Sequence, residues 1–152
     1  MQDNIKYQAI KKEIVEYSKT MYNDKLVSAT SGHISIRLFD RKDSFAITPS
    51  SENYLTMKSD RIVIMTLDGE ILECPKEAKP SSEWRLHAEI YRAKPEVGAI
   101  VHTHSPYATS FAVNRMGIPL ILIEMQPWLG GEIGVAEYAP TGSLQLGLNT
   151  AR

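Results

Sequence analysis

Apolar residues near the start of the chain recur at intervals of three and four, and beyond residue 33 the interval changes to two. The first pattern predicts an amphipathic helix, which follows two candidate capping residues, Asp3 and Asn4. The second pattern predicts a half-buried strand, because Ile34, Ile36 and Leu38 alternate with polar residues. The positions on the apolar face of the helix are Ile5, Ala9, Ile14, Val15, Ser18, Met21 and Tyr22.

Turn-forming residues between the next apolar runs predict three more strands. A polar turn at residues 40–43 separates the first strand from a second at residues 44–48. The dipeptide Asp68-Gly69 joins a run at residues 61–67 to one at residues 70–72, and this dipeptide is a strong signal for a two-residue hairpin turn. The first half of the chain therefore favours an antiparallel sheet preceded by one helix.

The second half alternates helical and extended patterns. The predicted elements are a helix from residues 80–83 to about Arg92, a strand at 97–104, a helix from Ser105-Pro106 to about Gly117, a strand at 120–123 and a helix after Gly142. Together they predict an α/β fold in the broad sense, with a mainly antiparallel central sheet flanked by helices. We expect a single domain over residues 1–152 whose C-terminal part is absent, because the chain stops in a helical stretch without a capping residue.

Composition narrows the possible partners and the compartment. The formal net charge of −1 argues against nucleic acid and against an anionic membrane as partners. The single cysteine, Cys74, excludes an internal disulfide and suits a reducing compartment. The polar residues 1–12 do not resemble a secretory signal, and the longest apolar runs are too short to span a bilayer. We therefore expect a cytoplasmic protein.

The triplet His102-Thr103-His104 is the most informative chemical motif in the sequence. Alternation along a strand places both imidazoles on one face, about 6–7 Å apart at the backbone. Their ring nitrogens can then converge on one zinc ion at about 2.0–2.1 Å. The alternative is a pair of strand-end histidines that form hydrogen bonds near the surface. The position of the pair, between an apolar strand and a helix, favours the metal site.

Three short polar segments are candidate anion sites. Ser81, Ser82 and Glu83 stand at a predicted helix N-terminus, where hydroxyls and free N–H groups bind anions or simply cap the helix. The loops at residues 30–33 and 48–51 offer backbone N–H groups to a phosphate, or are ordinary turns. The sequence has no P-loop, no G-x-G-x-x-G after a strand and no G-x-S-x-G, so nucleotide-binding and serine-hydrolase functions lack their signatures.

Taken in order, five strings resemble the class II aldolase/adducin family over roughly Ala9 to Leu148. The strings are T-S-G-H-I-S-I-R, I-T-P-S-S, K-P-S-S-E-W-R-L-H, V-H-T-H-S and G-S-L-Q-L, of which P-S-S-E and H-T-H are the specific ones. The resemblance implies a three-layer α/β/α domain, usually in a homotetramer with active sites between subunits. Within the family the chain is most similar to the L-fuculose-phosphate aldolases. This similarity implies zinc-dependent, reversible cleavage of L-fuculose 1-phosphate to dihydroxyacetone phosphate and L-lactaldehyde.

The same resemblance implies roles for individual residues. His102 and His104 match two of the three zinc histidines of the family. Glu83 matches a carboxylate that touches zinc in the resting enzyme and acts as acid and base once substrate displaces it. The residues that match phosphate-binding segments are Gly32, His33, Ser50, Ser51, Ser81 and Ser82.

Three departures from the family pattern affect these expectations. The third zinc histidine of the family lies beyond residue 152, so we expect the 152-residue chain to bind zinc weakly and to show little cleavage. His33 replaces an asparagine that is usual in the phosphate loop. No tyrosine stands near Ile123 and Glu124, where the fuculose-phosphate aldolases have one, so the general acid for the aldehyde half is unidentified. His87 is interpreted as a structural residue or as a partner of a metal ligand.

Other activities remain open at this stage. Superfamily epimerases that act on pentulose phosphates typically have aspartate where Glu83 stands, whereas dehydratases of the superfamily share the glutamate. An adducin-like, non-catalytic interaction module would lack the two zinc histidines that are present here. No residue of the sequence identifies the sugar.

Overall fold

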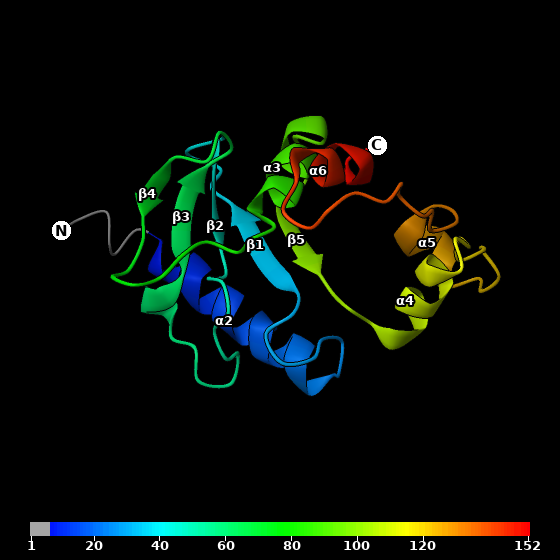
Figure 1. Cartoon of the computed structure of the whole chain (residues 1–152), viewed down its shortest axis with the longest axis horizontal. Coiled ribbons are helices and arrows are strands. Elements are labelled where there is room, and N and C mark those ends of the chain that lie inside the picture. The colour runs from blue at the N-terminus through cyan, green and yellow to red at the C-terminus, as the bar shows by residue number, and fades with distance from the viewer. Residues whose placement is uncertain (1–6) are drawn as a thin grey trace.

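The computed structural model describes residues 7–152, in which five strands form one sheet in the order β4-β3-β2-β1-β5 (Figure 1). All neighbouring strands are antiparallel, which confirms the predicted sheet. The candidate caps Asp3 and Asn4, and Ile5 of the first helical face, lie outside the described residues. The elements are α2 (Gln8–Asn23), β1 (His33–Arg37), β2 (Ser44–Ile47), the 3-10 helix η1 (Ser59–Arg61), β3 (Val63–Thr66), β4 (Ile71–Glu73), α3 (Trp84–Ala93), β5 (Ala99–His102), α4 (Pro106–Val113), α5 (Met125–Leu129) and α6 (Leu144–Thr150).

Each face of the sheet has its own hydrophobic core, because successive side chains of a strand point to opposite faces. On one face Ile14 of α2 belongs to a buried cluster with Ile34 and Ile64 of the sheet. On the other face Tyr91 of α3 belongs to a second cluster, in which its ring packs against that of Phe45. The domain thus has three layers, with the sheet between α2 and α3. Full burial of each large apolar side chain contributes about 1.5–3 kcal/mol to the stability of this arrangement.

The pairing of β1 with β5 determines which residues meet at one end of the sheet. The register places His33 opposite His102, and Ser35 opposite Ile100. Ser35 contacts His87 of α3, so its face of β1 is the one that α3 covers. His33, two residues earlier, shares that face. Two histidines that are 69 residues apart in the sequence are therefore brought together beside α3.

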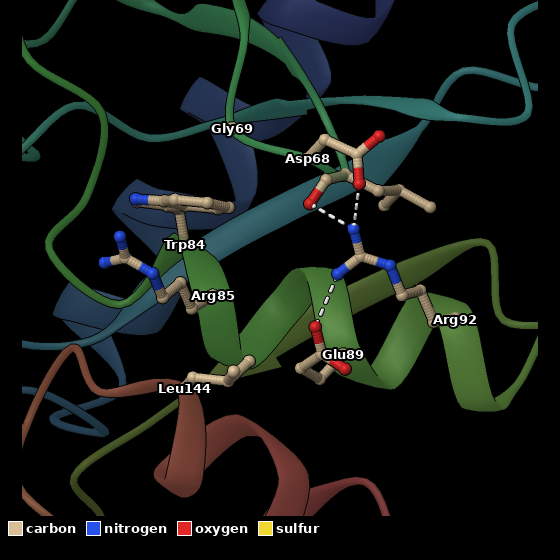
Figure 2. Close-up of a pocket in the computed structure, with 8 residues that line it drawn as sticks. Asp68, Gly69, Trp84, Arg85, Glu89, Arg92 and Leu144 are labelled. Carbon is tan, nitrogen blue, oxygen red and sulfur yellow. Dashed lines mark hydrogen bonds and ion pairs between the residues drawn. The ribbon is translucent and has the colours of Figure 1, made fainter.

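Helix α3 is anchored at both ends to the hairpin between β3 and β4 (Figure 2). Trp84 lies against the turn at Gly69, where a Cβ would be 2.5 Å from an indole carbon and φ is +92°. At the other end Arg92 donates a hydrogen bond of 2.9 Å to the carbonyl of Leu67 and pairs with Asp68 at 2.5 Å. The first turn of α3 is therefore held in a fixed position over the sheet.

The segment after β5 differs from the sequence prediction. Helix α4 begins at Pro106 as expected, but residues 120–123 form no strand. A single antiparallel bridge joins Ile118 to Ile133, and helix α5, which was not predicted, begins at Met125 after a turn. Figure 1 shows α4 and α5 set apart from the sheet, so the apolar run has no sheet edge to pair with. Ile121 and Ile123 are accordingly 75% and 84% exposed.

The predicted C-terminal helix is present as α6. Its cap is Ser143, whose hydroxyl accepts a hydrogen bond from the Leu146 N–H at 3.1 Å, and the helix ends at Thr150. Gly147 allows close contact with α3, because a Cβ there would be 2.9 Å from the carbonyl oxygen of Arg85. Among residues 7–152, no helix has the length and apolar character that a membrane span requires.

Candidate active site

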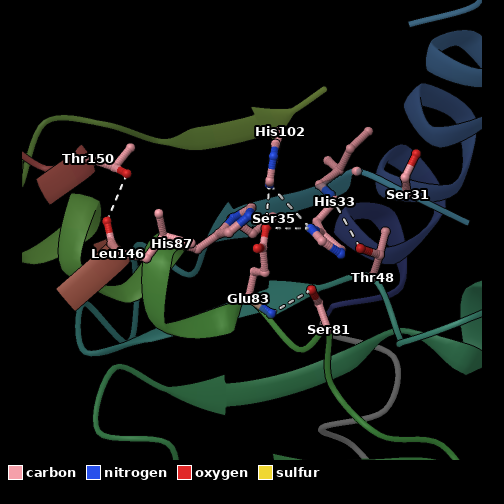
Figure 3. A network of polar contacts seen from close by, with 12 residues as sticks. Ser31, His33, Ser35, Thr48, Ser81, Glu83, His87, His102, Leu146 and Thr150 are labelled. Atoms are coloured by element: carbon pink, nitrogen blue, oxygen red, sulfur yellow. Dashed lines mark hydrogen bonds and ion pairs between the residues drawn. The ribbon is translucent and has the colours of Figure 1, made fainter. Parts of the chain in front are cut away.

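The site forms where the end of β5, the beginning of β1 and the beginning of α3 meet. His102 is the last residue of β5, and His33, the first residue of β1, lies opposite it. Glu83 is the N-cap residue of α3, and His87 lies about one helical turn further along. Figure 3 shows the side chains of His33 and His102 directed toward Glu83. The pairing of two strands and the start of one helix therefore place these four side chains together.

Three polar atoms converge at this point (Figure 3). Nδ1 of His102 lies 2.9 Å from Oε2 of Glu83, and Nδ1 of His33 lies 3.7 Å from the same oxygen. The two Nδ1 atoms are 3.4 Å apart. His104, beyond the end of β5, stacks its ring on that of His102 with centroids 5.1 Å apart. The predicted residues His102 and Glu83 are thus in direct contact, whereas His104 lies beside them and His33 joins them.

Electrostatics favours a charged carboxylate among neutral imidazoles. The hydrogen bond from His102 lowers the pKa of Glu83 against the opposing effect of burial. Burial, followed by repulsion from His102, lowers the pKa of His33 to about 4. Burial also lowers the pKa of His104. At neutral pH the site therefore combines one anionic carboxylate with the neutral imidazoles of His33 and His104, and imidazole and carboxylate donors suit Zn²⁺ and similar divalent ions.

His87 lies behind the converging atoms and is fully buried. Its Nδ1 is 2.7 Å from Oγ of Ser35, which in turn is 2.8 Å from the hydroxyl of Tyr91. Burial lowers the pKa of His87 to about 3, and its Nε2 has no hydrogen-bond partner among the described residues. One ligand nitrogen each from His33, His87 and His102 lies within 4.8 Å of the others. The orphaned nitrogen and the three-histidine cluster both fit a bound metal ion.

Most of the predicted phosphate residues line one cavity of about 410 Å³ beside these donors. The exception is Ser81, which is fully buried and whose Oγ accepts a hydrogen bond from the N–H of Glu83 at 3.2 Å. The residues that line the cavity are Ser28, Ala29, Thr30, Ser31, Gly32, His33, Ser50, Ser51, Ser82, Glu83, His104 and Thr141. The cavity therefore brings the hydroxyl-rich turns together with one edge of the candidate metal centre.

Sequence reasoning missed two features of this site. His87 was interpreted as structural or as a metal-ligand partner; the structure places one of its ring nitrogens in the three-histidine cluster and leaves its Nε2 without a partner among the described residues. His33 was assigned only to phosphate, because the pairing of β1 with β5 was not evident from local patterns. One signal was available in the sequence. His33 stands two residues before Ser35, so the two side chains lie on the same face of the strand.

The fold and the site together define a three-layer protein with a cluster of histidines and a carboxylate beside a cavity lined by hydroxyl-bearing turns. Residues 12–152 match the family described as Class II Aldolase and Adducin N-terminal domain, and the chain belongs to this family. The predicted family and its three-layer fold are therefore confirmed.

Individual relatives carry aldolase names. The chain is 39% identical over 137 residues to a 5-deoxy-D-ribulose 1-phosphate aldolase of Bacillus thuringiensis serovar kurstaki, covering 90% of this chain and 62% of the relative. It is 35% identical over 136 residues to an L-fuculose phosphate aldolase of Methanococcus vannielii, covering 89% and 70%. A solved structure of an L-fuculose 1-phosphate aldolase is 34% identical with a TM-score of 0.87, covering 94% of this chain and 66% of that one. The chain thus spans about two thirds of the length of these relatives.

Proposed function

We propose that this chain forms the metal- and phosphate-binding part of a zinc-dependent aldolase that reversibly cleaves a ketose 1-phosphate. L-fuculose 1-phosphate is the proposed substrate, with dihydroxyacetone phosphate and L-lactaldehyde as products. The observation that carries the proposal is the contact of Glu83 with His102 at 2.9 Å, beside a cavity lined by hydroxyls and a glycine loop. The aldolase names of the relatives support the same reaction class.

The proposed ligands of the zinc ion are His102, His104 and Glu83. Burial keeps His104 unprotonated at neutral pH by lowering its pKa, and the pKa of Glu83 is lowered as well. A bound zinc ion supplies a Lewis acid for the negative charge that develops on the substrate carbonyl oxygen during cleavage. The exposed His104 and the buried Glu83 both line the cavity and would hold the ion beside it.

Glu83 is the proposed acid and base. Cleavage leaves an enediolate on the phosphate-bearing half of the ketose, and the carbon next to the carbonyl must then receive a proton. In the direction of condensation the same carbon must lose a proton. The lowered pKa of Glu83 keeps Oε2 unprotonated at neutral pH, so this oxygen is ready to accept that proton.

The cavity residues are proposed to bind the phosphate group. Ser82 lies at the N-terminus of α3, where free N–H groups and the helix dipole favour an anion. Ser50 and Ser51 face the same cavity, and their hydroxyls lie 3.4 Å apart. Gly32 adds a loop with positive φ, whereas Ser81 contributes by holding the backbone of Glu83. Binding the phosphate here positions the reacting carbons beside Glu83.

The test is an assay of the zinc-loaded protein against a panel of ketose 1-phosphates, with dihydroxyacetone phosphate measured as product. The proposal predicts that L-fuculose 1-phosphate releases dihydroxyacetone phosphate and that Glu83→Gln abolishes the release. A product with inverted stereochemistry would instead indicate an epimerase. Loss of water from a pentulose phosphate would indicate a dehydratase. If the assembled protein binds the sugar phosphate but does not turn it over, the protein is a non-catalytic module.

We also propose that the protein is cytoplasmic and that it assembles as a homotetramer. The assembly is supported by large apolar side chains that are exposed along the segment from α4 to α5 and in the residues that follow it. Examples are Tyr107, Trp128 and Tyr138, which are 85%, 86% and 76% exposed. Apolar surface of this extent is typical of protein interfaces.

A further inference from the structure

The donor atoms of His33, His102 and Glu83 lie close to the spacing of ligands around one ion. Their separations are 2.9, 3.4 and 3.7 Å. Two ligands at about 2.0–2.2 Å from a tetrahedral metal are about 3.3–3.5 Å apart. The 3.4 Å separation lies in that range, and the other two would need to change by about 0.2–0.6 Å for the triangle to surround a zinc ion.

A proton alone explains this triangle less well than a cation does. His102 donates its Nδ1 proton to Glu83, which leaves Nδ1 of His33 facing an N–H at 3.4 Å and a carboxylate oxygen at 3.7 Å. If Nδ1 of His33 also carried a proton, the two N–H groups would face each other. If it does not, it can accept at 3.4 Å only the proton that His102 already donates to Glu83, and its lone pair lies 3.7 Å from the negatively charged oxygen. A divalent ion in place of the His102 proton satisfies all three atoms at once.

We propose that His33 is a metal ligand in this protein and supplies its third imidazole, beside His102 and His104. This inference rests on the proposed function. It revises the expectation that only two histidines and Glu83 of this chain are available to the ion. It also moves His33 from the phosphate site to the metal centre, so phosphate contact at this loop falls to backbone N–H groups.

The backbone before His33 holds its ring in this direction. Gly32 has φ +79°, and a Cβ there would be 2.6 Å from the carbonyl oxygen of His102. The hydroxyl of Tyr54 donates a hydrogen bond to the carbonyl of Gly32 at 2.5 Å, with the carbonyl of Ser31 at 3.1 Å, and so fixes the loop. The side chain of His33 is only 13% exposed, which limits its freedom to turn toward solvent.

His87 provides an independent observation. It is fully buried, its Nε2 has no hydrogen-bond partner among the described residues, and one of its ring nitrogens lies within 4.8 Å of ligand nitrogens of His33 and His102. A buried polar atom without a partner is costly, and a cation or a metal-bound water in front of it removes that cost. A buried imidazole with an unpaired nitrogen therefore lies in the same histidine cluster as the triangle.

The test is calorimetric titration of the 152-residue chain with Zn²⁺, together with the visible absorption of the Co²⁺-loaded form. His33→Asn, which restores the family's usual residue, should weaken Zn²⁺ binding at least about tenfold and change the Co²⁺ spectrum. His33→Gln is the second variant if the first fails to fold. Ser50→Ala is the matched control from the same cavity and should leave Zn²⁺ affinity unchanged. Affinity of the His33 variant for inorganic phosphate should stay within about twofold, because backbone groups make that contact.

The outcomes separate this inference from the function on which it rests. Unchanged Zn²⁺ affinity in His33→Asn, with weakened phosphate binding, would overturn the inference and return His33 to the phosphate site. His102→Asn must lose Zn²⁺ binding if the proposed metal centre exists. If the His102 variant loses the ion and the His33 variant retains it, only the inference fails. If both retain it, the proposed function fails as well.

Discussion

At the scale of single residues, the properties of the site follow from a carboxylate at a helix start among imidazoles at strand ends. The hydrogen bond from His102 lowers the pKa of Glu83, and burial lowers the pKa of His33. The sequence motif predicted that His102 and Glu83 act together, and the structure places them in contact. The participation of His33 in this contact was not predictable, because it depends on a residue of the neighbouring strand that is 69 positions away in the sequence.

Glu83→Gln tests the proton-transfer role. The amide retains the size of the side chain but cannot accept a proton, so we expect kcat to fall by about 10²–10⁴-fold. Binding of inorganic phosphate should change little, because Ser50, Ser51 and Ser82 remain in the cavity. Steady-state kinetics and phosphate titration check the two halves. Retention of kcat within a few-fold would show that another group transfers the proton.

The buried histidines predict how stability depends on pH in the presence of a chelator. His33 and His87 have pKa values lowered to about 4 and about 3, so between those values and 6.5 the unfolded chain binds more protons than the folded one. The free energy of unfolding should therefore fall as pH falls below about 6.5, by about 2 kcal/mol per histidine between pH 7 and pH 5. Urea unfolding at several pH values measures the slope.

A matched variant identifies the source of that slope. His87→Gln should flatten the decrease by the share of one histidine, because the amide does not titrate. An equal slope in the variant and the parent would show that His87 is not held neutral in the folded state.

At the scale of elements, local patterns predicted more than long-range pairings did. The Asp68-Gly69 hairpin, the helix after Glu83 and the helix at Pro106 are confirmed because turn and cap residues act on their immediate neighbours. The strand at residues 120–123 was wrong because an apolar run does not indicate whether a neighbouring strand exists. Helix α5 was missed because five residues carry too little periodicity.

Gly32 tests the loop that positions His33. Gly32→Ala combines a left-handed φ of +79° with a Cβ 2.6 Å from the carbonyl oxygen of His102. We expect a loss of stability of roughly 2–3 kcal/mol and weaker Zn²⁺ binding, because β1 and β5 must separate. Gly130→Ala is the control: its φ is +71°, but no atom lies within 4 Å of the added Cβ, so its loss should be roughly 1 kcal/mol. Equal losses would show that the close approach to His102 is not important.

At the scale of the whole molecule, the three-layer domain buries most of its large apolar side chains, whereas the α4–α5 segment leaves many of its own exposed. Large apolar residues such as Tyr107, Ile123 and Trp128 are more than 80% exposed there. The chain also spans only about two thirds of the length of its relatives. The residues of the sequence alone therefore did not predict the assembly or the sugar specificity, because no motif of this chain identifies either property.

Self-association through the α4–α5 segment is the prediction at this scale. Trp128→Glu should shift the protein toward monomers in size-exclusion chromatography with light scattering, because it places a charge in an apolar interface. Tyr17→Glu is the control, since Tyr17 is 56% exposed on α2, away from this segment. An unchanged mass distribution in Trp128→Glu would exclude this surface from the interface.

The most direct test of the central claim is proton exchange on dihydroxyacetone phosphate in D₂O. This half-reaction needs the phosphate cavity, the zinc ion and Glu83, but not the unidentified acid of the aldehyde half. With zinc present, the account predicts that NMR detects deuterium entering the hydroxymethyl carbon next to the carbonyl. A chelator, Glu83→Gln or His102→Asn should abolish the exchange. If dihydroxyacetone phosphate binds to the zinc-loaded protein without exchange, or exchanges equally fast with Glu83→Gln, the proposed aldolase site is contradicted.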